Sequence, residues 1–468
     1  MSFLLRDKCH QLANCGHLLL LNLKLQPMIL LGRNKLIILL LILAFALNLK
    51  VQAQVEVKGI SLDEAIQLTL KNNKQISIAQ VDESIAKSQY LQTTAFFLPQ
   101  VNLSHTAYST NNPLNVFGFK LQQATVQQTD FNPSLLNNPS AYSNYTSQVN
   151  VQQPLINMDL LYSRKAAKQQ TVVYNNQTKR TTEAIKMQVV QAYLYLEFSY
   201  QYQQVTAEAL RTVTAIYKLT NDRFNQGLMQ KSDLLNVEVQ VKLAEVQNKQ
   251  ATSQIENVSD QLSVLMNTPK GIVFKVMPYT LNQQNTRSDS VSLGRSDIMA
   301  MSAALTSYDF AIKGTKMSWL PKLNAFGNYQ LNDKSMSFSG ATSYMAGIQF
   351  SWDIFKGNQI KNKVTTQKFE KQKMQEQLSS QLETGTVEIR KTKRTIQDAA
   401  YKIIQQKLAV SQAEEALRIL QNRYSQGLVS TNDILMSQTQ VSQQKLLLAQ
   451  ATLEQNSAIN YLDFLTSK

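Results

Sequence analysis

The sequence is poor in cysteine, and both of its cysteines lie close to the N-terminus. Cys9 and Cys15 precede Ala53, after which we expect an export signal to be cleaved. The mature chain would then contain no cysteine, which excludes disulfides, a cysteine metal site and a lipid anchor on an N-terminal cysteine. Histidine is nearly as scarce, because His105 is the only one after residue 53. His105 falls in an expected strand, where a structural role is favoured over a ligand role.

Sequence signals for catalysis are also missing. The chain shows no glycine-rich phosphate loop, no nucleophile triad and no cluster of metal ligands. We therefore expect no enzyme, no cofactor and no bound metal. The formal net charge is +15, and removing residues 1–53, with their six basic residues and one acidic residue, leaves +10. Because these charges are spread along expected helices, they favour a solvated surface over nucleic-acid binding.

The N-terminal residues have the pattern of an export signal. Arg33 and Lys35 precede the apolar run Leu36–Leu47, and small residues suited to cleavage follow at Val51-Gln-Ala53. The run is about 12 residues long, which is too short to span a bilayer, although a membrane anchor is the alternative. We interpret residues 1–53 as a signal peptide, and residues 1–27 within it as an over-long translation start.

Proline is absent from two long stretches of the chain. Leu155–Thr268 and Lys322–Lys468 contain none, and both are rich in Gln, Lys, Leu, Ala and Val, which suits very long helices. We predict helices over 158–224 and about 358–424, each followed by a partner helix. The first partner has a heptad seam, which is typical of coiled-coil packing; a simple antiparallel bundle is the alternative. The seam positions are Leu234, Val237, Val241, Ala244, Asn248, Ala251, Ile255, Val258, Leu262 and Leu265.

A segment at the end of the first long helix recurs 200 residues later. Arg223–Asp233 matches Arg423–Asp433, and a repeat on this scale predicts two copies of one helical unit. Upstream, Leu98-Pro99 matches Leu320-Pro321 at a longer offset. The first copy therefore carries about 22 extra residues, which must lie in 110–141, and the prolines, asparagines and serines there predict a long loop.

Between the helices, apolar and polar residues alternate with a period of two. The alternation covers about residues 100–110, 142–155, 321–332 and 342–355, and it predicts four half-buried strands in two hairpins, one in each copy. Each strand is about ten residues long, the length that a tilted transmembrane strand needs. Two ordinary hairpins packed on a soluble domain are the alternative.

Several short motifs recur in a fixed order along the chain. They are Ser61-Leu-Asp-Glu-Ala65, Arg295-Ser-Asp-Ile298, the two Leu-Pro strand starts, Trp352-Asp-Ile-Phe-Lys-Gly357 and both Arg-aromatic-x-x-Gly-Leu bends. Each motif is weak by itself, but their order and the repeat together are specific. Taken together, these features resemble the TolC-like outer-membrane efflux family over about residues 58–467. Arg295-Ser-Asp297 departs from the family's usual Arg-Pro-Asp.

The resemblance implies a mainly α-helical chain with a small membrane β-barrel portion. Two tandem repeats, each helix–β-hairpin–long helix–turn–helix, would occupy residues 54–268 and 295–468, joined by a linker at 269–294. Four strands per chain would complete a trimeric twelve-stranded barrel, continued by a periplasmic α-helical tunnel. Physical reasoning agrees, because four strands leave open edges that lipid cannot satisfy. The apolar faces would meet lipid, the polar faces would line water, and residues 110–141 would form a surface loop.

The two bends would lie at the far periplasmic end of the tunnel. Gly227 and Gly427 suit the left-handed conformation that ends a helix, and the neighbouring arginines and aspartates complement the helix dipoles. By the resemblance, the bends dock a periplasmic adaptor and form a closed aperture; the alternative is that their residues are only good helix caps. The docking candidates are Arg223, Phe224, Gly227, Leu228, Arg423, Tyr424, Gly427 and Leu428.

The candidates for the aperture are Asp233, Tyr424 and Asp433. In the family, an aromatic residue at the second bend can pair with an acid at the first, and Tyr424 and Asp233 match those positions. We hypothesise that this pair helps to hold the tunnel shut. Some family members line the aperture with two acids one turn apart; Asp433 matches the first, but Met436 occupies the second. A ring of Asp433 side chains would favour cations.

The resemblance predicts the outer-membrane exit duct of a tripartite efflux system in a Gram-negative bacterium. The homotrimer would extend from outer-membrane lipid into the periplasm. It would passively conduct small toxic compounds from an inner-membrane pump, of the resistance-nodulation-division or ABC type, and a periplasmic membrane-fusion adaptor. No nucleic acid is expected as a partner. The alternatives are an exit duct for type I protein secretion and, from a different class, a periplasmic coiled-coil scaffold.

Overall fold

The computed structural model describes residues 57–277 and 289–467, so the expected signal peptide, residues 1–53, lies outside them. The first repeat starts with two helices separated by Asn73. The Ser61 hydroxyl caps the first of them by accepting a hydrogen bond from the Glu64 amide at 3.2 Å. The elements of this repeat are α2 (Leu62–Asn72), α3 (Lys74–Gln92), η1 (Thr93–Phe97), β2 (Gln100–Thr110), β3 (Tyr142–Ile156), α6 (Met158–Asn225) and α7 (Lys231–Met266).

The second repeat has the same order of elements. A small parallel pair of strands, β1 (Val57–Ile60) and β4 (Val273–Val276), links the start of the first repeat to the segment before the second. The predicted mainly helical chain, with strands in two repeats, is confirmed. The elements of the second repeat are α8 (Ser296–Met317), β5 (Lys322–Asp333), β6 (Ala341–Ser351), α9 (Gln359–Ser425) and α10 (Thr431–Thr466).

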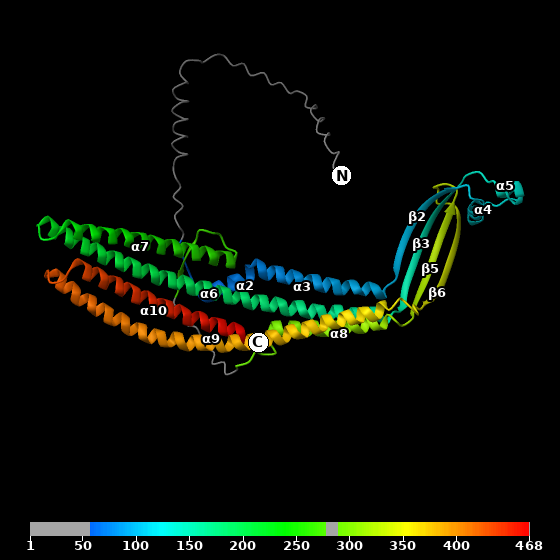
Figure 1. The fold of residues 1–468 in the computed structure, drawn as a ribbon. Coiled ribbons are helices and arrows are strands. Elements are labelled where there is room, and N and C mark those ends of the chain that lie inside the picture. Colours follow the sequence, from blue (N-terminus) through cyan, green and yellow to red (C-terminus); the bar gives the residue numbers. More distant parts are fainter. Residues whose placement is uncertain (1–56, 278–288, 468) are drawn as a thin grey trace, which may run out of the picture. The chain divides into compact units, whose positions relative to one another are not determined.

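The long helices run side by side, with the four-stranded sheet at one end and both bends at the other (Figure 1). Helix α6 has 68 residues, so it rises about 100 Å. It packs against α3, α7 and α8, while α9 packs against α8 and α10. The heptad seam faces the partner helix, since Val237, Ala251 and Leu262 are buried. No helix in the described residues is long and apolar enough to cross a membrane.

A buried tyrosine fixes the small parallel strand pair to the long helices. The Tyr193 hydroxyl donates to the carbonyl oxygen of Ile60 at 3.0 Å and accepts a hydrogen bond from the Met277 amide at 2.9 Å. Apolar residues of α6, α7 and both strands pack around it, including Ile255 and Phe274. Because burial disfavours the charged phenolate, the pKa of Tyr193 is raised. This cluster anchors the middle of the helical part.

The four-stranded sheet has the order β2-β3-β5-β6, and all of its neighbours are antiparallel. Its register places Leu103, Val149 and Tyr329 in one row on the same face. Tyr344 continues that row on β6. This face is exposed in the single chain, where Leu103 is 74% and Tyr344 is 83% accessible. The sheet therefore presents an apolar face that is largely exposed in the described chain.

The opposite face of the sheet is mainly polar. Asn102, Asn150 and Asn328 form one row across β2, β3 and β5. The Asn150 Oδ1 atom accepts hydrogen bonds from Asn328 Nδ2 at 2.9 Å and from Gln148 Nε2 at 2.5 Å. Such side-chain ladders, opposite an apolar face, are typical of strands with lipid on one side and water on the other.

Two expectations for the strand region differ from the structure. The last strand ends at Ser351 rather than at about 355, because its partner β5 begins at Lys322, and Lys322 pairs with Ser351. The segment 110–141 is not a structureless loop. It contains two short helices and a 3₁₀ helix, because Asn112 and Asn132 act as N-caps and each is followed by a proline at the first helical position. These elements are α4 (Pro113–Gln122), η2 (Gln128–Phe131) and α5 (Pro133–Asn137).

Candidate functional site

Both bends end a long helix with the same backbone hydrogen-bond pattern. The amide of Leu228 donates to the Arg223 carbonyl oxygen at 2.9 Å, and the amide of Gly227 donates to the Phe224 carbonyl oxygen at 2.9 Å. The second bend repeats this with nearly identical lengths. The two glycines have φ values of +73° and +77°, which complete a Schellman motif that other residues adopt only with strain. The glycines therefore make rigid, reproducible turns.

Tyr424 lies inside the second bend and is only 1% exposed. Its hydroxyl is 2.7 Å from the Thr220 Oγ1 atom of α6 and 3.2 Å from the Thr431 Oγ1 atom of α10. The Thr220 contact joins the two bends across the repeats. In the described chain, the Tyr424 hydroxyl bonds to these threonines and forms no hydrogen bond with Asp233. The hypothesis that the Tyr424–Asp233 pair helps to hold the assembled tunnel shut stays a prediction. Because the two threonines satisfy the hydrogen-bonding capacity of the Tyr424 hydroxyl, the side chain is stable in its buried position.

An arginine of the first bend makes a second link to the other bend. The Arg223 Nη2 atom donates to the Ser425 carbonyl oxygen at 2.7 Å, and the guanidinium lies 5.2 Å from the centre of the Tyr424 ring. Apolar side chains of α6, α7, α9 and α10, including Val237 and Ile434, pack beneath this contact. The bends therefore form one packed unit, not two independent hairpins.

The two aspartates that follow the bends are in different environments. The Ser430 amide donates to the Asp433 carboxylate at 3.0 Å and the Asp433 amide donates to the Ser430 hydroxyl oxygen at 3.2 Å, which together form a capping box at the start of α10. The Ser430 hydroxyl also donates to the Asp433 carboxylate at 2.8 Å. The hydrogen bond from the Ser430 hydroxyl, followed by the one from the Ser430 amide, lowers the pKa of Asp433 below its ordinary value. Gln230, the N-cap residue of α7, makes no side-chain capping hydrogen bond, and the Asp233 carboxylate has no hydrogen-bond partner within the described residues. The capping alternative thus fits Asp433, whereas Asp233 has a free carboxylate.

The tip also exposes apolar side chains. Leu228 is 69% exposed and Leu428 is 68% exposed, although each sits on a rigid turn. Phe224 is half-buried with the Lys231 ammonium 5.2 Å from its ring centre, and Arg423 is exposed. Two leucines held in equivalent, solvent-exposed positions are suited to contact another protein.

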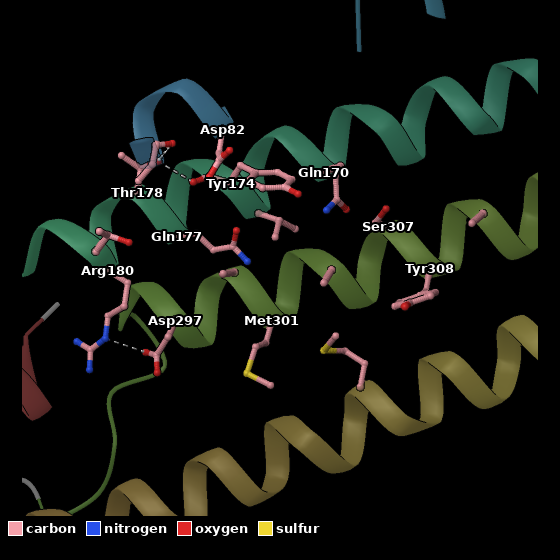
Figure 2. Close-up of a pocket in the computed structure, with 17 residues that line it drawn as sticks. Asp82, Gln170, Tyr174, Gln177, Thr178, Arg180, Asp297, Met301, Ser307 and Tyr308 are labelled. Atoms are coloured by element: carbon pink, nitrogen blue, oxygen red, sulfur yellow. Dashed lines mark hydrogen bonds and ion pairs between the residues drawn. The ribbon is translucent and has the colours of Figure 1, made fainter. Parts of the chain in front are cut away.

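A separate cleft of about 770 Å³ lies between α6 and α8, far along the chain from the bends. Figure 2 shows Arg180 and Asp297 at one end of it, with Tyr308 and Ser307 toward the other. Small residues of α8, such as Ala300 and Ala304, form its floor. The sequence pattern did not point to this cleft.

The Arg295-Ser-Asp297 motif lies at that cleft: Arg295 and Ser296 are buried, and the half-buried Asp297 lines the cleft. Arg295 is 1% exposed and binds Asp297 through two hydrogen bonds of 2.6 and 2.8 Å. Burial by itself would raise the pKa of Asp297, but the Arg295 contacts outweigh it and the net pKa is lowered. In α9, a Cβ on Gly385 would lie 2.6 Å from Val291 and 3.3 Å from an Arg295 nitrogen. The motif is therefore a structural node at the start of α8.

Several residues that organise these sites escaped the sequence analysis. Thr220 and Thr431 hold Tyr424, and Arg180 contributes to the cleft. Thr431 is only seven residues from Tyr424, on the other side of the same bend, so the sequence could have suggested this contact. Thr220 is 204 residues from Tyr424, and no local pattern links the two.

Comparisons with known proteins give a consistent result. The family model for outer membrane efflux proteins matches residues 65–268 and 288–467. No curated protein matches the sequence.

Several solved structures share the fold. The CmeC outer membrane channel of Campylobacter jejuni is 18% identical, with a TM-score of 0.73 over 86% of this chain and 85% of that one. The outer membrane protein VceC of Vibrio cholerae is 17% identical, with a TM-score of 0.70 over 86% and 94%. The open-state MtrE outer membrane channel of Neisseria gonorrhoeae is 15% identical, with a TM-score of 0.66 over 86% and 89%. Since the family model covers most of the sequence, the chain belongs to the outer membrane efflux protein family.

Proposed function

We propose that this protein is the outer-membrane exit duct of a tripartite efflux system and passively conducts small toxic compounds to the exterior. The observation that carries the proposal is the two-faced sheet joined to helices of about 100 Å. Its apolar face is exposed and its opposite face is mainly polar. Such a sheet is stable where lipid covers one side and water fills the other.

The open edges of the sheet support assembly with further copies. Strands β2 and β6 are the edge strands of the four-stranded sheet. Unpaired backbone groups are too costly in lipid, so the edges must pair with other chains. Three copies would close a barrel of twelve strands, and the helices of each copy would continue it as a tunnel into the periplasm. In this assembly, residues 54–268 and 295–468 act as the two repeats, and residues 269–294 link them.

The packed tip supports roles in docking and closure. The exposed Leu228 and Leu428, with Arg223, Phe224, Gly227, Arg423, Tyr424 and Gly427, would contact a periplasmic membrane-fusion adaptor. The aperture would use the free carboxylate of Asp233 and the remaining acceptor atom of Asp433, while Tyr424 fixes the bend that carries them. An inner-membrane pump of the resistance-nodulation-division or ABC type would supply the energy.

The assembly can be tested by extraction and conductance. The protein should leave outer membranes only with detergent, run as a heat-modifiable trimer, and form water-filled channels in planar bilayers. A chain that is released without detergent as a monomer would favour the periplasmic coiled-coil scaffold instead.

The transported substrate needs a separate test, because protein secretion uses the same kind of duct. Deleting the gene should increase susceptibility to small toxic compounds and leave the set of secreted proteins unchanged. Loss of a secreted protein with unchanged susceptibility would favour the exit duct of type I secretion.

A further inference from the structure

The extra segment of the first repeat, residues 112–141, packs at the end of the sheet that lies away from the long helices (Figure 1); we call it the inserted lobe. At the C-terminal end of α4, Gln123 is 6% exposed and Asn144 of β3 is 0% exposed. The Gln123 Nε2 atom donates to the Asn144 Oδ1 atom at 2.7 Å and to the Ser143 carbonyl oxygen at 3.0 Å. The Gln123 Oε1 atom accepts a hydrogen bond from the Tyr142 hydroxyl at 2.8 Å. The lobe is therefore seated on β3 by a buried polar contact.

The register of the sheet shows which face the lobe covers. Asn144 and Tyr142 alternate in phase with Gln148 and Asn150, the residues of the polar face. On the neighbouring strand, Tyr108 pairs with Asn144, and its ring lies 5.7 Å from that of Phe119 in α4. Each contact places the lobe over the polar face at the end of the sheet away from the long helices (Figure 1).

The other hairpin of the sheet behaves differently. In the β5–β6 turn, the Phe338 ring lies 5.4 Å from His105, a residue in phase with the apolar face. This turn therefore folds toward the apolar face. The contrast shows that covering the polar face is a property of the inserted lobe, and does not follow from simply closing a hairpin.

The lobe has its own small core and ion pair. Val116 is 4% exposed, and the rings of Phe117 and Phe131 meet edge to face at 5.6 Å. The Lys120 ammonium lies 2.6 Å from the Asp130 carboxylate, and this bond is the largest cause of the lowered pKa of Asp130. These internal contacts stabilise a single conformation of the lobe.

We propose that the inserted lobe is a size-limiting constriction at the outer mouth of the duct, seated by Gln123. The inference rests on the proposed function, since the polar face lines a lumen only if the sheet closes into a barrel. Three lobes, one from each copy, would then project over the same opening. They would let small solutes leave and exclude bulky solutes from the external medium.

A lumen-facing cysteine tests this proposal in intact cells. Ser104 lies on the polar face and pairs with Gln148 of β3. Gln148 is four residues from Asn144, so Ser104 lies about 13 Å farther from the inserted lobe along the strand direction. Its neighbour Leu103 lies on the apolar face and provides the matched control. Ser104→Cys and Leu103→Cys would be made with Cys9 and Cys15 replaced by Ser. Each would be treated from outside with a small sulfonated maleimide and with a bulky polyethylene-glycol maleimide.

The small reagent should label Ser104→Cys and not Leu103→Cys, while the bulky reagent should label neither. Adding Gln123→Ala should speed bulky labelling of Ser104→Cys by about tenfold, the factor for a hydrogen bond of about 1.4 kcal/mol. Replacing residues 113–139 with a short Gly-Ser turn should remove the size limit altogether. Phe338→Ala, in the other hairpin, should leave both rates unchanged.

The outcomes separate the two proposals. Bulky labelling that is already fast in the intact lobe, or that neither change alters, would overturn the constriction and leave the duct intact. If Leu103→Cys is labelled and Ser104→Cys is not, the assignment of faces is wrong and the duct fails as well. Trimer formation, followed by heat modifiability, confirms folding of each variant.

Discussion

Tyr424 and Phe224 occupy equivalent positions in the two bends, but only the tyrosine has a hydroxyl to place. That hydroxyl bridges Thr220 and Thr431 in a site that excludes water. A buried hydroxyl with two partners stabilises the contact between helices, whereas an unpaired one would cost free energy. The two bends are therefore similar in sequence, but only the second contains a buried hydroxyl that links helices.

A double-mutant cycle should separate the two partners considered for Tyr424. Tyr424→Phe should lower the free energy of unfolding by about 1–2 kcal/mol. It should be non-additive with Thr220→Val, because those side chains touch. With Asp233→Asn it should be additive, as expected for residues that are not bonded in the chain. Denaturant unfolding in detergent measures each free-energy difference, and strong coupling to Asp233 would support the Tyr424–Asp233 pairing hypothesis instead.

Asp433 should give the start of α10 a dependence on pH. Its folded-state pKa is lowered, so its stabilisation is present above the unfolded value of about 3.9 and is lost as the pH falls through the folded pKa. Asp433→Asn keeps an acceptor oxygen but removes the charge. Hydrogen exchange of the peptide after the second bend should be faster than wild type at neutral pH and equal to it in acid. Equal exchange in the two proteins at neutral pH would contradict this role of the Asp433 carboxylate.

The helices and strands show which elements a sequence can predict. Helices α6 and α9, the bends and the four strands follow from local patterns: missing proline, period-two alternation and glycine after an aromatic residue. The helices of the inserted lobe were missed because Asn-Pro pairs are common in loops as well as at helix starts. The Tyr424–Thr220 contact was missed because it joins residues 204 positions apart. Contacts between repeats depend on how the whole chain packs.

Gly385 of α9, which packs against Arg295, should tolerate substitution by alanine poorly. Alanine favours a helix over glycine by about 1 kcal/mol, yet a Cβ at Gly385 would lie 2.6 Å from Val291. Gly385→Ala should therefore lower the melting temperature. Gly118→Ala in α4, where a Cβ meets nothing within 4 Å, should leave it unchanged or raise it. Equal effects of the two changes would show that the Arg295 node is loosely packed.

The whole assembly depends on the opposite character of the two faces of the sheet. Ile348 lies on the apolar face and is 68% exposed in the single chain, whereas its neighbour Gln349 lies on the polar face. In a closed barrel, the first would meet lipid and the second would meet water.

Lysine substitutions at these neighbours should have opposite outcomes. Ile348→Lys should cost about 2–4 kcal/mol if it lies near the middle of the bilayer, and it should reduce the amount of heat-modifiable trimer in the outer membrane. Gln349→Lys should assemble normally. Equal assembly of both variants would contradict the lipid-facing assignment.

The order β2-β3-β5-β6 also has a consequence for how the protein is made. The central pair of the sheet joins the two repeats, since Val149 of β3 pairs with Tyr329 of β5. In a chain exported from its N-terminus, as we propose, the first hairpin would reach the periplasm while β5 is still being synthesised or translocated. Until β5 arrives, the β3 edge of the first hairpin is unpaired, which is a state prone to aggregation. We therefore expect a periplasmic chaperone to shield the β3 edge of the first hairpin until the second hairpin arrives.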